Sequence, residues 1–297
     1  MERMIGYPIV QVKTTDSLWL HGLFLRSSKG KAVFLNVHGT ASNFYEEYFI
    51  EVMSEKFLDA GISMLSTNNR GAGVYDAYQK TGAATELFED SVIDIDTWIK
   101  FALDEGCEDI ILSGHSLGTE KVAYYMSHGK YADKVVALVL LAPADSYGSH
   151  RILEGKDNTK IRENIESLLK ESEDLIREGK GDVFLPRDTY GSHSGIMPKT
   201  PSSLVNFLGP KSKLLDALPL ATGKLEAYRK INVPILVVIG DQEEYTALTT
   251  KDALVLMKKE NELTEAVELK GCDHDFQGCE DELTKAVLNF IQDKISN

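Results

Sequence analysis

The chain has 297 residues, of which 43% are hydrophobic and 26% charged, as is usual for a soluble globular protein with one large core or two smaller ones. Its 46 acidic and 32 basic side chains give a formal net charge of −14, which argues against a nucleic-acid partner. No stretch reaches the ~18 consecutive apolar residues of a membrane span, and the N-terminus lacks the apolar core of a secretory signal. We therefore expect neither a nucleic acid nor a membrane as partner.

The first half of the chain alternates between extended and helical patterns. The segments PIVQVKT and LWLHGLFLRS alternate in polarity around a short polar turn, which predicts a β-hairpin. KAVFLNVHG predicts a buried strand, and apolar residues at helical spacing follow it at 44–60. ISMLSTNN predicts the next strand, and a second helical pattern follows it at 85–105. DIILSGHS predicts a further strand, the helix 117–128 comes next, and VVALVLLAPA is so apolar that both of its faces must be covered.

The same alternation returns near the C-terminus. PILVVIGD predicts a strand, 249–259 a helix, EAVELKG a strand and 281–295 a closing helix. Alternation of this kind predicts an α/β fold, in which a mostly parallel sheet carries helices on both faces.

The alternation is interrupted between Ser146 and Leu220. A charged amphipathic helix is predicted at 162–177. Beyond it we expect irregular structure, because that stretch holds five of the chain's eight prolines. These are Pro186, Pro198, Pro201, Pro210 and Pro219. The segment also carries aromatic and thioether side chains, namely Tyr147, Phe184, Tyr190, Met197 and Phe207.

A long insertion in a regular sheet is commonly a lid or cap over a site. We therefore expect the core at 1–145, an inserted cap at 146–220 and the second part of the core at 221–297. The alternative is an insertion that only packs on the core.

Ser116 lies in Gly114-His115-Ser116-Leu117-Gly118, between a predicted strand and a predicted helix. This G-x-S-x-G pattern is typical of a nucleophile elbow, a sharp turn that exposes the serine hydroxyl at the carboxyl edge of the sheet. A serine that merely caps the helix would not need both glycines. We therefore predict that Ser116 is a nucleophile.

A serine hydroxyl needs a base, and the base in turn needs an orienting carboxylate. His274 is the one histidine beyond the last strand, in ELKGCDHDFQG, where a loop can bring its ring over the sheet edge. The carboxylate should follow PILVVIGD, where GDQEEY offers Asp241, Glu243 and Glu244. We favour Glu243, which lies farther from the strand end, and Asp241 stays open as the alternative.

Acyl transfer also needs N–H donors for the developing oxyanion. The backbone N–H of Leu117 follows the nucleophile directly. A second N–H is expected from Thr40 in HGTASNF, after the third strand, although Thr40 could simply form a turn.

The cysteines Cys107, Cys272 and Cys279 are an odd number for a disulfide framework, and a reducing cytoplasm is the simplest location. Cys272, His274 and Cys279 suggest a zinc site, but a fourth ligand and paired Cys-x-x-Cys spacing are missing. No metal is predicted.

HGT, NNRGAG, GHSLG, GDQEE and GCDHDF occur in the order and approximate spacing seen in the α/β-hydrolase superfamily, which the chain resembles from about Lys31 onward. The resemblance implies an eight-stranded, mostly parallel sheet, a Ser116–Glu243–His274 triad and no cofactor. Many relatives carry aspartate where this chain has its glutamate-rich acid loop. GHSLGTEK with EEY also faintly resembles siderophore-type ester hydrolases.

These features predict a serine hydrolase that cleaves an ester, thioester or related acyl bond of a small to medium substrate. An acyltransferase would use the same triad, and a non-catalytic binding protein could keep the same fold. A nucleotide-binding Rossmann domain is disfavoured, because HGTASN lacks the expected G-x-G-x-x-G. The sequence does not determine the substrate or the oligomeric state.

Overall fold

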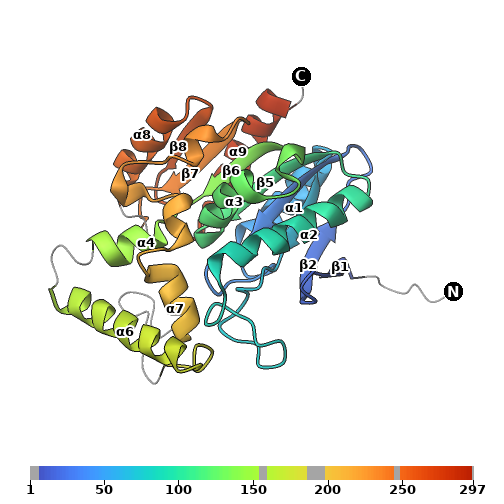
Figure 1. Ribbon diagram of the computed structural model, residues 1–297. Helices are drawn as coiled ribbons and strands as arrows, with labels where there is room; N and C mark the ends of the chain where they lie inside the picture. Colours follow the sequence, from blue (N-terminus) through green and yellow to red (C-terminus); the bar gives the residue numbers. More distant parts are fainter. Residues whose placement is uncertain (1–6, 154–158, 186–197, 244–247, 296–297) are drawn as a thin grey trace.

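A single eight-stranded sheet forms the centre of the molecule (Figure 1). The computed structural model describes residues 7–153, 159–185, 198–243 and 248–295, with the side chains of 153–162 also left aside. The strand order across the sheet is β1-β2-β4-β3-β5-β6-β7-β8. The strands are β1 (Ile9–Lys13), β2 (Trp19–Leu25), β3 (Ala32–Val37), β4 (Ser63–Thr67), β5 (Asp109–His115), β6 (Val135–Leu141), β7 (Ile235–Gly240) and β8 (Thr264–Leu269).

The sheet is parallel except around β2, which pairs antiparallel with both β1 and β4. The hairpin expected at the N-terminus and the mostly parallel sheet are therefore confirmed. In the central strands Val37 lies opposite Gly114, and His115 lies opposite Leu141. This register brings the carboxyl ends of β3, β5 and β6 level with one another. In open α/β sheets the ligand site lies in the crevice at that edge.

Helices cover both faces of the sheet. α1 (Phe49–Asp59) and α9 (Glu280–Ile295) lie on one face, where their buried residues form one core with Phe34, Met64 and Ile111. α2 (Ser91–Asp104), α3 (Leu117–His128) and α8 (Thr250–Glu260) contribute to the core on the other face. Because adjacent residues of a strand point to opposite faces, the apolar strands fill both cores.

The inserted segment, residues 146–220, follows β6, and its described residues lie outside the sheet (Figure 1). It contains the short helical turns α4 (Ser146–Gly148) and η3 (Ser149–Leu153), then α6 (Thr159–Arg177) and α7 (Pro201–Leu208). Leu168, Leu204 and Phe207 of this segment share an apolar cluster with Leu117, the first residue of α3, and Tyr124, in the second half of that helix. The inserted segment therefore packs beside the carboxyl edge of the sheet.

Two helices differ from the prediction, α1 in where it begins and α7 in that it forms at all. α1 begins at Phe49 rather than near Phe44, because the Asn43 side chain accepts hydrogen bonds from the N–H groups of Tyr45 and Glu46 and holds that stretch in a turn. α7 arises where we predicted irregular structure. Pro201 is its first residue, a position that needs no backbone N–H, and the Thr200 hydroxyl caps the helix.

Smaller 3₁₀ turns complete the described chain. They are η1 (Phe88–Asp90), which precedes α2, η2 (Ala132–Lys134), η4 (Lys213–Asp216), η5 (Leu220–Thr222) and η6 (Tyr228–Lys230). Pro186, Tyr190 and Met197, which we singled out in the sequence, lie outside the described residues. Within the described part of the chain, no helix has the length and apolar character needed to cross a membrane.

Candidate active site

Ser116 occupies a sharp turn between β5 and α3. Its φ of 54° and ψ of −125° are unusual for a residue with a side chain and are typical of backbone strain held at a functional site. A Cβ atom on Gly114 would collide with the carbonyl of Gly118, and one on Gly118 would collide with the carbonyl of Val37. The two glycines therefore let α3 pack directly over β5 and β3, which produces the turn.

The loop after β3 lies directly against this serine. A Cβ added to Gly39 would sit 2.8 Å from the Ser116 Cβ and 3.3 Å from its Oγ. Thr40 follows in an exposed turn, and Leu117 is the buried first residue of α3. The first N–H groups of a helix have no acceptor inside the helix, so the Leu117 amide can serve an oxyanion.

Glu243 and His274 are brought together by the loops after β7 and β8. The His274 Nδ1 lies 2.8 Å from the nearer carboxylate oxygen of Glu243, whose side chain is only 1% exposed. Gly240 allows the contact, since a Cβ there would meet the carbonyls of Cys272 and Asp273. Asp241 instead accepts a hydrogen bond from the backbone N–H of Gly271 at 2.7 Å and is exposed. Of the two candidate acids, Glu243 is thus the one that contacts the imidazole.

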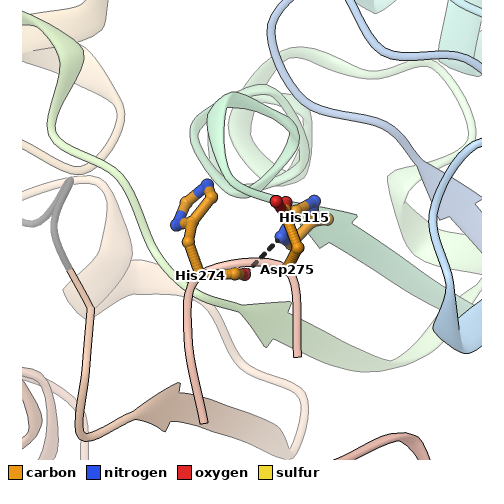
Figure 2. Close-up of side chains that lie close together, drawn as sticks. All are labelled: His115, His274 and Asp275. Carbon is orange, nitrogen blue, oxygen red and sulfur yellow. Dashed lines mark hydrogen bonds between the residues drawn. The ribbon is translucent and has the colours of Figure 1, made fainter. Parts of the chain in front are cut away.

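His115 joins the serine turn to the His274 loop. Its Nε2 lies 2.9 Å from the backbone carbonyl of His274 (Figure 2). Its Nδ1 lies 3.1 Å from the Glu47 carboxylate. Burial alone would lower the pKa of His115, but the charge and hydrogen bond of Glu47 outweigh burial and raise it to about 9. The sequence analysis assigned no role to His115, and its position beside Ser116 was the only signal.

The side chains of His115, His274 and Asp275 lie close together (Figure 2), and one ligand atom from each falls within 4.8 Å of the others. Both ring nitrogens of His115 already face protein acceptors. A nitrogen that donates a hydrogen has no lone pair for a metal. The cluster is therefore better explained by hydrogen bonding than by metal coordination.

Cys272 and Cys279 form a disulfide with their Cα atoms 5.9 Å apart, and Cys107 is a buried free thiol. The prediction from the odd cysteine count is corrected here, because one pair and one free thiol also make three. The disulfide closes the loop that carries His274. Since both sulfurs are bonded to each other, neither is a thiolate ligand for zinc.

A buried polar network supports the loops around the serine. His38 is fully buried, and its Nε2 accepts from the Asn69 N–H at 3.2 Å while its Nδ1 lies 2.7 Å from the Gly39 carbonyl. Lys121 on α3 donates to Asn69 at 2.9 Å and to Glu86 at 2.7 Å. Burial, then the charge of Lys121, lower the pKa of His38 to about 4, so its ring is neutral at pH 7.

The lysine and glutamate of this network were missed in the sequence. Lys121 lies on a predicted helix and Glu86 in a predicted helical stretch, where charged residues are usually exposed. The two residues are 35 positions apart in the sequence, so no local pattern predicts their pairing. By contrast, the proximity of Glu243 to His274 follows from two loops at the same sheet edge, which the strand pattern does predict.

Comparisons with known proteins agree with this architecture. The family model of serine aminopeptidases of the S33 type matches residues 28–169. A search of curated proteins gives no match. Many solved structures match, at identities so low that they support the fold alone.

Three of these structures cover nearly the whole chain. Est1E from Butyrivibrio proteoclasticus, with ferulic acid bound, is 18% identical with a TM-score of 0.69 over 97% of this chain and 100% of its own. DcsB, in complex with an analogue of its substrate, is 16% identical with a TM-score of 0.70 over 98% of this chain and 100% of its own. Esterase Pf2001 from Pyrococcus furiosus is 17% identical with a TM-score of 0.60 over 98% and 92%, respectively.

The sheet order, the strained serine turn between β5 and α3, and the acid and histidine loops after β7 and β8 all point to one architecture. The family match and the structural likenesses agree with it. The chain has the α/β-hydrolase fold.

Proposed function

We propose that this protein is a serine hydrolase that cleaves a carboxylic ester, thioester or related acyl bond through an acyl-serine intermediate. The observation that carries the proposal is the 2.8 Å contact between Glu243 and the His274 Nδ1. His115, the neighbour of Ser116 in the chain, lies with its ring 5.0 Å from the His274 ring, and Ser116 itself has a φ of 54°. A buried carboxylate on Nδ1 fixes the tautomer in which Nε2 carries the lone pair and can accept a proton. A solvent-facing loop histidine would need no such partner.

In the proposed first step, the Ser116 Oγ attacks the acyl carbonyl carbon while His274 Nε2 takes the hydroxyl proton. The carbonyl π-electron pair moves to the oxygen, and the N–H groups of Leu117 and Thr40 stabilise the resulting oxyanion. When the carbonyl re-forms, the bond to the leaving group breaks and the imidazolium of His274 gives that group its proton. Glu243 stabilises the positive charge of the ring between these transfers.

In the second step water replaces the leaving group. His274 takes a proton from the water as the water oxygen attacks the acyl-serine. The second tetrahedral intermediate collapses, releases the carboxylic acid and returns the proton to Ser116 Oγ. An acyltransferase would use an alcohol or amine in place of the water, and nothing in the described residues favours that outcome.

We further propose that the inserted segment acts as a cap that shapes the substrate site. Asp145, directly before the segment, accepts hydrogen bonds from the N–H of Gly148 at 2.6 Å and from that of Ala221, directly after it, at 2.7 Å. These bonds bring both ends of the segment together. Leu204 and Phe207 pack toward Leu117, beside the proposed nucleophile. An apolar cap at this position would exclude water and favour small to medium acyl groups.

The test compares purified wild-type protein with Ser116→Ala on short-chain p-nitrophenyl esters and on aminoacyl p-nitroanilides. Ser127→Ala, at the exposed end of the same helix, is the matched control. We expect the wild type and Ser127→Ala to hydrolyse the esters and Ser116→Ala to lose turnover. Preference for the anilides would assign the amide chemistry for which the matching family is named, and full turnover by Ser116→Ala would remove the proposed nucleophile.

A further inference from the structure

Each ring nitrogen of His115 faces an acceptor. The Nε2 lies 2.9 Å from the His274 backbone carbonyl, and the Nδ1 lies 3.1 Å from the Glu47 carboxylate. Neither acceptor carries a hydrogen when Glu47 is ionised, so both contacts are hydrogen bonds only if both nitrogens are protonated. The geometry therefore requires an imidazolium, buried beside the proposed nucleophile.

We propose that His115 is a positioning residue, a buried imidazolium that clamps the His274 loop to the loop that carries the proposed oxyanion donor. The inference rests on the proposed function, since it concerns the same reaction. It adds a residue that never touches substrate but fixes the backbone from which the proposed base projects.

The Glu47 end of the clamp belongs to the loop after β3. Glu47 is buried, its second carboxylate oxygen accepts from the Asn36 side chain at 2.6 Å, and its carbonyl accepts from the N–H of Ile50 at 3.1 Å. Glu47 is therefore anchored to both β3 and the start of α1. Through Glu47, His115 is tied to the loop that contains Gly39 and Thr40.

The other end of the clamp is the backbone of the His274 loop. Phe276 of this loop has a φ of 56°, and its ring lies 6.2 Å from the His115 ring. Phe49 of α1 packs edge-on against His115, at 5.5 Å between ring centroids. The two aromatic rings exclude water from the clamp, which strengthens its hydrogen bonds.

The charges around His115 favour its protonated form. Glu47 faces it from the loop after β3, and Asp275 faces it from the His274 loop (Figure 2). The ring of His274 lies 5.0 Å away, and His38, at the end of β3, is close enough to act on Glu47. Although burial opposes protonation, the two carboxylates outweigh it and the pKa of His115 is about 9.

The sign of the pH dependence follows from this pKa. Because the pKa of about 9 lies above the usual 6.5, the folded ring stays protonated at neutral pH and loses its proton as the pH rises through 9. Its contribution to stability is full below pH 6.5 and is lost over the same rise. The neutral ring can donate from only one nitrogen, so one end of the clamp opens. We therefore expect kcat to fall above about pH 9 while KM changes little.

The kinetic test compares three replacements of His115. His115→Phe keeps the ring volume but donates nothing, His115→Asn places a donor near the Nδ1 position, and His115→Gln places one near the Nε2 position. His21, exposed on β2, provides the matched control His21→Gln.

We expect His115→Phe and His115→Asn to lower kcat roughly 10- to 100-fold with KM nearly unchanged, the cost of a base displaced by a fraction of an ångström. His115→Gln should keep kcat within about fivefold of wild type, because it can still hold the His274 carbonyl. A role in packing alone would reverse this order and leave His115→Phe the most active.

A second measurement does not depend on turnover. Nitrogen-15 shifts of the His115 ring should show both nitrogens protonated at pH 7, with titration near pH 9. Glu47→Gln keeps an acceptor but removes the charge, so the ring should titrate at lower pH and the alkaline loss of kcat should move with it. A ring that is neutral at pH 7, or a titration that Glu47→Gln leaves unchanged, would overturn the clamp.

Ser116→Ala separates the two proposals. If Ser116→Ala abolishes turnover while His115→Phe has wild-type kcat, the clamp is wrong and the proposed function stands. If Ser116→Ala keeps full turnover, the proposed function is wrong whatever the His115 variants do.

Discussion

The Glu243 carboxylate holds the His274 Nδ1 at 2.8 Å, whereas Asp241, two residues earlier, accepts from the backbone N–H of Gly271. The first contact orients an imidazole and the second ends a turn. The difference explains why only one of two neighbouring acids would matter for chemistry.

This contact predicts unequal effects of two conservative substitutions. Glu243→Gln should lower kcat for ester hydrolysis by roughly 10²- to 10⁴-fold, because the neutral amide neither fixes the tautomer nor stabilises the imidazolium. Asp241→Asn should change kcat by less than about threefold, since its oxygen can still accept from Gly271. Steady-state kinetics on the same ester measures kcat of both variants. A larger loss of kcat in Asp241→Asn would show that Asp241, and not Glu243, orients the imidazole.

The disulfide between Cys272 and Cys279 brackets His274, so its loss should loosen the loop that carries the proposed base. For a closed loop this short, removing the bond in Cys272→Ser/Cys279→Ser should lower the free energy of unfolding by about 2–3 kcal/mol and also reduce kcat. Urea denaturation and ester kinetics measure the two effects.

Thiol titration of the unfolded, unreduced protein checks that disulfide independently. One reactive thiol, from Cys107, is expected. Three thiols in protein purified without reductant would show that the bond does not form. Since disulfides are rare in reducing compartments, the same titration in material taken from the native source tests the cytoplasmic location expected from the sequence, and a single thiol there would contradict it.

Lys121 and Glu86 form an ion pair whose side chains are 0% and 1% exposed. Lys121→Met removes the cation that donates a hydrogen bond to the buried Glu86 carboxylate. We expect a loss of about 3–5 kcal/mol in the free energy of unfolding. Lys130→Met, at an exposed lysine, is the control and should change stability by less than about 0.5 kcal/mol. Equal stability of the two variants would show that the pair is not buried as described.

His38 gives the fold a predicted sensitivity to acid. Its pKa is lowered to about 4 from the usual 6.5, so its contribution to stability is present above pH 6.5 and is lost as the pH falls through 4. Protonation would also remove the lone pair that accepts from Asn69. His38→Gln does not titrate, so between pH 7.5 and 5 the wild type should lose about 2 kcal/mol more than the variant. Urea denaturation at both pH values measures this, and a constant difference would contradict it.

Much of the fold followed from local patterns in the sequence. The alternation of apolar strands and amphipathic helices has a physical origin in burial, so it predicts the parallel sheet and places Ser116, Glu243 and His274 at one edge. The turn at Ser116 was predictable because two backbones approach too closely there for any side chain.

Other features depend on contacts between distant residues and leave no local pattern. The pairing of His115 with Glu47 spans 68 residues and that of Lys121 with Glu86 spans 35, so only the folded chain shows them. The prediction of irregular structure in the proline-rich stretch was wrong at α7 for a different reason. Proline breaks a helix from within, yet Pro201 begins one, and composition alone does not separate the two cases.

The most direct test of the central claim is covalent labelling of the native protein by a fluorophosphonate probe, with the modified residue located by mass spectrometry. An activated serine next to an oriented imidazole should be labelled at Ser116 in a single equivalent, and Ser116→Ala and His274→Ala should each abolish labelling. Labelling at another serine, or undiminished labelling of the His274→Ala protein, would contradict the account.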